Sequence, residues 1–144
     1  MRKVLVLSLL ALSIISNSSC APTPKISVEI NQEVQSTIEI DYPILQTMMN
    51  SDQEFILYVY DTFCTSCLEF RPVLLEVIET HHLVIYAVIS SSLVDSLTIQ
   101  YTPTLFTIAN GEVVSSIDMY HQPNSFASAS QFEHYLESVV DWSS

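Results

Sequence analysis

Positively charged residues are scarce in this chain, and their scarcity limits what it can bind. Among its 144 residues are only 4 lysines and arginines against 16 aspartates and glutamates, which gives a formal net charge of −12 at pH 7. Nucleic acid and bare anionic membrane would both repel so acidic a protein, so neither is expected as a partner. A solvated surface that keeps the protein soluble is the simpler explanation of the charge.

Glycine is almost absent, which makes the position of the one glycine informative. Gly111 follows Asn110 between two apolar runs. Asn-Gly in such a place is the strongest short-range signal of a β-hairpin, because both residues tolerate a positive φ. We therefore expect a tight turn at this dipeptide.

Cysteine is also rare, which argues against a structural zinc site. Such a site needs four ligands, usually from a second cysteine pair or a histidine pair. The chain has only Cys20, Cys64 and Cys67. Its four histidines do not show the spacing of a zinc finger: His81, His82, His121 and His134. No metal is expected, and zinc is kept only as a minority interpretation of the cysteine pair.

No apolar run is long enough to cross a membrane comfortably, which takes about 20 residues. The N-terminal run, Val4 to Ile15, follows Arg2 and Lys3 and gives way to polar residues, as in a secretory signal peptide. We therefore expect residues 1–19 to be a signal peptide of a protein that leaves the cytoplasm.

Cys20 follows this run and resembles the lipid-carrying cysteine of a bacterial lipoprotein signal. Asn17 departs from that pattern, which prefers an aliphatic residue three positions before the cysteine. The expectation is lipidation at Cys20, which would anchor the protein to the outer face of the bacterial cell membrane. Plain cleavage nearby, giving a secreted or periplasmic protein, is the alternative.

The stretch from Phe55 to Pro72 organises the rest of the chain. Phe55–Tyr60 is an unbroken apolar run typical of a strand buried on both faces, and Cys64 and Cys67 then open a helix. At the start of a helix the unpaired N–H groups favour a negative sulfur on Cys64. Cys67, one turn later, is close enough to form a disulfide with it. A structural disulfide across so short a loop would stabilise little, so a redox pair is favoured.

Periodicity predicts the remaining elements. Residues 20–35 are expected to form a tether and an early strand, because Ile26, Val28 and Ile30 alternate with polar residues. A single domain is expected over residues 36–144. Its predicted elements are an alternating strand at 37–41, helices at 43–50 and 64–80, a strand at 83–89, a short helix within 90–100, a hairpin over 101–114 and a closing helix at 131–142.

This order resembles the thioredoxin fold over Ile38 to Val140. Four features carry the resemblance: Cys64-Thr65-Ser66-Cys67 after a buried strand, Pro72 five residues past the second cysteine, Thr102-Pro103-Thr104 in the place of the cis-proline loop, and the Asn-Gly hairpin. It implies an α/β fold with a mixed central sheet and helices on both faces. Exported, membrane-anchored thioredoxin-like proteins, including those found with bacteriocin export, are more similar than the cytosolic reductase.

Several positions depart from the thioredoxin pattern. Phe63 precedes the first cysteine, where thioredoxin has tryptophan, and Tyr58 stands where thioredoxin buries an aspartate. The lysine that accompanies that aspartate has no counterpart. Asp61 or Glu69 is the candidate for the missing proton acceptor.

The resemblance implies an extracytoplasmic thiol–disulfide oxidoreductase that acts on proteins or peptides without a cofactor. Cys64 would attack a substrate disulfide and Cys67 would resolve the product, while Phe63, Thr102 and Pro103 would contact the substrate. The implied partners are protein or peptide thiols and disulfides, and a redox protein of the membrane. Two alternatives remain: a redox-inactive surface binding module, and, less favoured, a metal carrier that uses both cysteines and a histidine.

Overall fold

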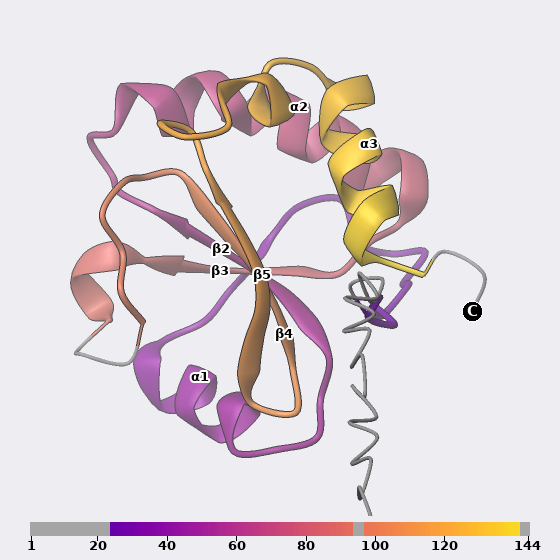
Figure 1. The fold of residues 1–144 in the computed structure, drawn as a ribbon, viewed down its shortest axis with the longest axis vertical. Coiled ribbons are helices and arrows are strands. Elements are labelled where there is room, and N and C mark those ends of the chain that lie inside the picture. Colours follow the sequence, from indigo (N-terminus) through magenta and orange to yellow (C-terminus); the bar gives the residue numbers. More distant parts are fainter. Residues whose placement is uncertain (1–23, 94–96, 142–144) are drawn as a thin grey trace, which may run out of the picture.

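The computed structural model describes residues 24–93 and 97–141. Figure 1 shows one sheet seen edge-on, with helices on both of its faces. The elements in chain order are β1 (Ile38–Glu39), α1 (Tyr42–Met49), β2 (Phe55–Tyr60), α2 (Thr65–His81), β3 (Ile85–Ile89), the 3₁₀ turn η1 (Ser90–Ser92), β4 (Thr104–Ala109), β5 (Glu112–Asp118), the 3₁₀ turn η2 (Pro123–Phe126) and α3 (Ala129–Val139).

The five strands form one mixed sheet in the order β1-β3-β2-β4-β5. β3 runs parallel to both β1 and β2, whereas β4 is antiparallel to β2 and to β5. β2 therefore lies at the centre, where Tyr58 pairs with Ala87 on one side and Leu105 on the other. A βαβ unit followed by an antiparallel hairpin was expected from the sequence, and the sheet confirms it.

Each face of the sheet has its own apolar core. α2 and α3 cover one face, and α1 covers the other (Figure 1). Phe70 of α2 is the centre of the larger core: it is fully buried, and its ring centroid lies 4.8 Å from that of Phe126 and 5.2 Å from that of Phe132. Leu45 and Met48 of α1 close the smaller core. The two covered faces confirm the predicted α/β architecture.

The helix that carries the cysteines buries a stripe with helical spacing. Cys64 is its N-cap, and the helix continues through Pro72 to His81. Its buried residues recur every three or four positions: Cys67, Phe70, Leu74, Val77 and Ile78. Leu68 was expected on this apolar side and is instead 61% exposed, because it follows Cys67 directly and so turns away from the stripe.

The segment expected as an early strand takes a different form. Ile26 and Val28 are buried in the larger core, but Ile26 bridges Val140 while Ile30 bridges Leu83. No ladder forms, because the two bridges reach different parts of the chain. The expected short helix is also wrong for the described residues of 90–100, where only η1 forms; positions 94–96 lie outside them.

The hairpin turn lies where the sequence predicted it. Asn110 and Gly111 connect β4 to β5 and have φ angles of 52° and 75°. A Cβ atom on Gly111 would collide with the backbone carbonyl of Met49 in α1. Glycine is therefore required both by the turn and by the close approach of the neighbouring chain.

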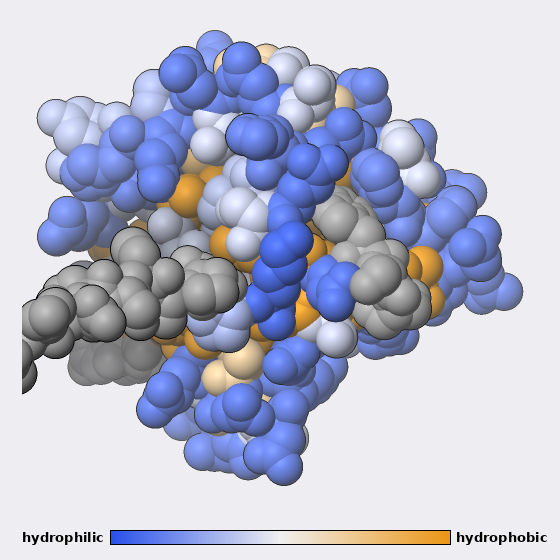
Figure 2. Space-filling view, turned by 45° about the vertical axis from the view of Figure 1, so that its right-hand side comes forward, coloured by the Kyte–Doolittle hydropathy of each residue, from blue (hydrophilic) through white to orange (hydrophobic). Residues whose placement is uncertain are grey.

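Polar side chains cover most of one face of the domain (Figure 2). In the face that Figure 2 shows, hydrophilic residues dominate and apolar residues appear only in small areas between them. Within the part of the chain that the structure describes, no helix has both the length and the apolar character needed to span a membrane.

Candidate functional site

Cys64 and Cys67 form a disulfide at the N-terminus of α2, with their Cα atoms 5.2 Å apart. The two sulfurs have different surroundings. Cys64 is partly exposed and accepts a hydrogen bond of 3.1 Å from the backbone N–H of Cys67, whereas Cys67 is only 4% exposed. An N–H group aimed at one sulfur stabilises negative charge there. The pair therefore has one outward and one buried sulfur.

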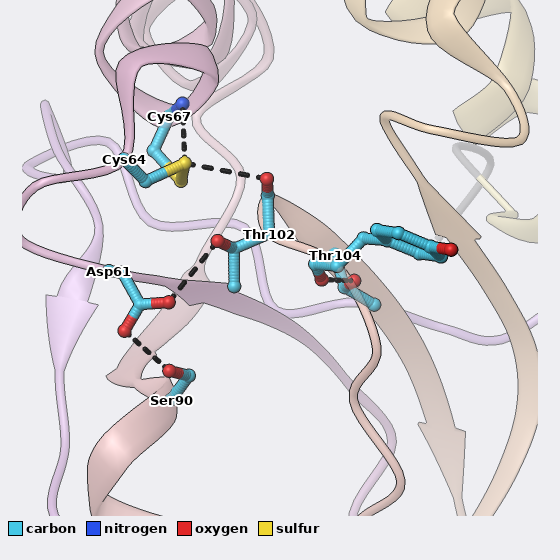
Figure 3. The surroundings of a disulfide bond; sticks show 7 residues. Asp61, Cys64, Cys67, Ser90, Thr102 and Thr104 are labelled. Atoms are coloured by element: carbon cyan, nitrogen blue, oxygen red, sulfur yellow. Dashed lines mark hydrogen bonds between the residues drawn. A yellow bond between two sulfur atoms is a disulfide. The ribbon is translucent and has the colours of Figure 1, made fainter.

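The loop before β4 brings Thr102 and Pro103 against the disulfide. The peptide bond between these two residues is cis, and Pro103 is buried. The carbonyl oxygen of Thr102 lies 3.4 Å from Cys64 Sγ, as Figure 3 shows. Thr104 Oγ1 donates to the Tyr101 carbonyl and closes the turn of this loop. The resemblance implied this cis-proline loop, and the structure places it at the outward sulfur.

Asp61 connects three segments near the disulfide through hydrogen bonds of its carboxylate. Its carboxylate accepts one hydrogen bond from Thr102 Oγ1 at 3.2 Å and another from Ser90 Oγ (Figure 3). The residue follows β2, while its partners belong to the loop before β4 and to η1. Asp61 therefore holds the Thr102 loop in place beside Cys64, a role that was not expected from the sequence.

A pocket of about 280 Å³ lies behind the disulfide, on the side of the buried sulfur. Cys67 contributes to its wall together with residues from β1, β2 and α2. The charged residues and tyrosines in its lining are Glu39, Tyr58, Tyr60, Asp61 and Arg71. The rings of Tyr58 and Tyr60 stack with their centroids 5.4 Å apart, and Tyr60 Oη donates a hydrogen bond of 3.0 Å to Glu39. The buried sulfur therefore belongs to a residue that borders a partly polar pocket.

Tyr58, in the position of thioredoxin's buried aspartate, cannot act as the missing base. Burial, with the neighbouring Tyr60 as a second cause, raises the pKa of Tyr58 well above its ordinary value, so its hydroxyl stays protonated at neutral pH. Of the two acids considered in its place, Asp61 borders the same pocket as Cys67, whereas Glu69 is exposed and does not border it. Of the two acids, only Asp61 therefore lies beside this pocket, and its carboxylate already accepts hydrogen bonds from Ser90 and Thr102.

A groove runs beside the outward sulfur, bordered by Cys64, Phe63, Asp61, Ser91 and Thr102. The side chain of Phe63 is 96% exposed there. Two further exposed aromatic rings, those of Tyr101 and Tyr120, stack on each other next to the Thr102 loop with their centroids 4.4 Å apart. Exposed aromatic rings thus border Cys64 and lie beside the Thr102 loop.

Asp118, at the end of β5, supports the exposed aromatic pair. Partial burial alone would raise the pKa of Asp118, but hydrogen bonds from His121 and Tyr120 outweigh burial and lower it. The ring of His121 packs edge-on against both Tyr101 and Tyr120. This cluster could not be predicted from the sequence, because its members meet only through the loop after β5.

The structure brings together most of the residues that the sequence singled out. Phe63, Cys64, Cys67, Thr102 and Pro103 meet at one end of the sheet. Cys20 lies outside the described residues. Within residues 24–93 and 97–141, no group of three or more His, Cys, Asp or Glu side chains is arranged to hold a metal ion.

Solved structures with a similar architecture include thioredoxins. The chain superimposes on thioredoxin from Schistosoma mansoni with a TM-score of 0.55 and 20% identity, covering 73% of this chain and 99% of the other. A mutant thioredoxin from Halobacterium salinarum gives a TM-score of 0.57 and 15% identity, covering 74% and 93%. Thioredoxin F from spinach chloroplast gives 0.55 and 16%, covering 73% and 87%.

No protein-family model matches the chain, and no curated protein matches it in sequence. The low identities establish architecture rather than activity. What they share with this chain is the fold, which here is a mixed five-stranded sheet with helices on both faces. The chain has a thioredoxin-like fold.

Proposed function

We propose that this protein is an extracytoplasmic thiol–disulfide oxidoreductase that uses Cys64 and Cys67 on protein or peptide substrates. One observation carries the proposal: the two sulfurs form a disulfide at a helix N-terminus, and only the Cys64 sulfur receives a backbone N–H and faces the groove. A thiolate stabilised in this way is the nucleophile that thiol–disulfide exchange requires.

The chemistry follows from this asymmetry. With the pair reduced, the Cys64 thiolate attacks a substrate disulfide, one substrate sulfur leaves as a thiolate, and a mixed disulfide forms. Cys67 then attacks Cys64 Sγ, and the second substrate sulfur leaves. The pair ends oxidised and the substrate ends as a dithiol; the same steps in reverse oxidise a substrate dithiol. Phe63 and the backbone of Thr102 would contact the substrate chain beside Cys64.

Location and anchoring form the second part of the proposal. The charged start, the apolar run and Cys20 support export with lipidation at Cys20, as in the membrane-anchored thioredoxin-like proteins that the sequence resembles. A redox protein of the same membrane would restore the pair after each turnover. Changing Cys20→Ala should release the protein from membranes. A variant that is processed and membrane-bound like the parent would rule lipidation out.

A redox titration tests the central claim. Protein without residues 1–19 is equilibrated in buffers of graded thiol and disulfide, alkylated and weighed by mass spectrometry. We expect one reversible transition, and catalysis of the reduction or oxidation of a model peptide that Cys64→Ser and Cys67→Ser both abolish. A protein with no reversible transition, or one that cycles without transferring its disulfide to any peptide, would instead be a binding module.

A further inference from the structure

The buried cysteine has a requirement that the outward one does not share. To resolve a mixed disulfide, Cys67 must become a thiolate, and burial in an apolar core disfavours that charge. Cys67 is 4% exposed, and the N–H group that stabilises negative charge in this pair points at the other sulfur. The protein therefore needs another source of stabilisation near Cys67.

Arg71 is placed to provide it. The residue lies four positions after Cys67 on α2, hence on the same side of the helix, and both border the pocket behind the disulfide. Lys25 and Arg71 are the only lysine and arginine within the part of the chain that the structure describes. The chain has 16 acidic residues, yet Arg71 makes no hydrogen bond or ion pair with any described residue. Its positive charge is therefore not neutralised by a described carboxylate and can act on a nearby thiolate.

The other charged or titratable groups around the pocket cannot take this role. Glu39 on β1 and Asp61 after β2 are acidic, and a negative charge opposes a thiolate. Tyr58 and Tyr60 on β2 have pKa values raised, first of all by burial, so they stay neutral. Arg71 acts on both tyrosines in the opposite direction and lowers their pKa, which indicates that its charge reaches into the pocket.

We propose that Arg71 is a positioning residue for the redox pair, whose guanidinium charge stabilises the Cys67 thiolate through the pocket behind the disulfide. The inference rests on the proposed function. In the step concerned, the Cys67 thiol gives its proton to solvent in the pocket, and its sulfur attacks Cys64 Sγ. The bond between Cys64 and the substrate sulfur breaks, and that sulfur leaves as a thiolate.

Rapid mixing with the aromatic disulfide DTNB separates the two cysteines. Reduced protein releases one thionitrobenzoate when Cys64 attacks and a second when Cys67 resolves the mixed disulfide. All variants carry Cys20→Ser, so that only the pair reacts. Arg71→Gln is compared with two controls. Arg71→Lys keeps the positive charge at this position, and Lys25→Gln removes one positive charge at the beginning of the described chain.

We expect Arg71→Gln to slow the second release about threefold or more at neutral pH and to move its midpoint to higher pH, because an exposed opposite charge favours a nearby thiolate modestly. The first release should stay within about twofold of the parent, and Arg71→Lys and Lys25→Gln should both behave like the parent. High salt should reduce the difference, because Arg71 is exposed.

Two results would overturn the proposal: an unchanged pH profile for the second release in Arg71→Gln, or an equal shift in Lys25→Gln. Near-ultraviolet circular dichroism checks that each variant keeps its fold, and Arg71→Met, a second uncharged variant, takes the place of Arg71→Gln if the glutamine variant unfolds. If the parent itself forms no internal disulfide after the first release, the oxidoreductase function fails. Failure of the function is therefore distinguishable from failure of the role given to Arg71.

Discussion

The backbone N–H of Cys67 donates its hydrogen bond to Cys64 Sγ, so the residue with the buried sulfur stabilises negative charge on the outward sulfur. The two cysteines are thereby unequal before any substrate arrives. Cys64 lies at the helix N-terminus and borders the open groove, whereas the side chain of Cys67 is buried in the core and borders the pocket behind the disulfide. This division of surroundings leads to the first prediction.

Limited alkylation of the reduced protein should label Cys64 before Cys67. Cys64 is partly exposed and its thiolate is stabilised by the helix terminus, while Cys67 is buried. Substoichiometric iodoacetamide followed by peptide mapping would measure the ratio, with the denatured protein as the control for intrinsic reactivity. Preferential labelling of Cys67 in the native protein would reverse the two roles.

Phe70→Ala should destabilise the domain strongly. Its ring is fully buried among Phe126, Phe132 and Tyr58, so truncation leaves a cavity in the larger core and should lower the free energy of unfolding by about 3–5 kcal/mol. Urea denaturation would measure the loss. Phe63→Ala is the matched control: its ring is exposed, so stability should change by no more than about 0.5 kcal/mol. Similar losses in both variants would contradict the assignment of the core.

Gly111→Ala should disturb the hairpin and the helix beside it. The backbone there has a φ of 75°, and a Cβ atom would meet the carbonyl of Met49. A loss of more than about 1 kcal/mol in unfolding free energy is expected, because strain in the turn and a collision with α1 add together. Asn110→Gly, at the neighbouring positive φ, should cost little. Equal stability of Gly111→Ala and the parent would show that α1 can move away freely.

Alkaline pH should weaken the fold through Tyr58. Burial raises the pKa of Tyr58 above its ordinary value of 10.0, so the unfolded chain loses this proton at a lower pH than the folded one does. Its contribution to stability is therefore complete below pH 10.0 and falls as the pH rises toward the raised folded pKa. Tyr58→Phe should flatten the loss of stability that begins at about pH 10, as measured by urea midpoints.

The control for this experiment is Tyr120→Phe, which removes the same hydroxyl from an exposed ring. It should retain the alkaline loss of the parent. A Tyr58→Phe variant with the full alkaline loss would mean that another group controls stability in this range.

The parts of this molecule that the sequence predicted well are those with a local signal. The dipeptide Asn110-Gly111 favours a tight hairpin turn because both residues tolerate a positive φ. Two cysteines after a buried strand likewise indicate the N-terminus of a helix, where Cys64 is the N-cap. Phe55–Tyr60 was recognisable as the central strand because its apolar run is unbroken. Such features depend on neighbours in the chain and can be inferred without knowledge of the fold.

The parts that could not be predicted depend on contacts between distant segments. Glu39 and Arg71 border one pocket only because β1 joins the sheet beside β3 while α2 packs across it. Nothing in the sequence distinguishes Phe70 from Leu68 as a core residue. In the structure Phe70 is at the centre of the larger core, whereas Leu68 is exposed. Asp61 was noticed as an acid near the cysteines, but its hydrogen bonds to Ser90 and Thr102 require the finished sheet.

The bridges of Ile26 to Val140 and of Ile30 to Leu83 fix where the described chain begins relative to the disulfide. Ile30 reaches Leu83, just before β3 begins, whereas the disulfide follows the end of β2, and these two strands run parallel. The described chain therefore starts at the opposite end of the sheet from the cysteines, on the side of α3 (Figure 1). A partner that bound the first described residues would therefore lie far from Cys64 and Cys67 and would leave the groove beside Cys64 open.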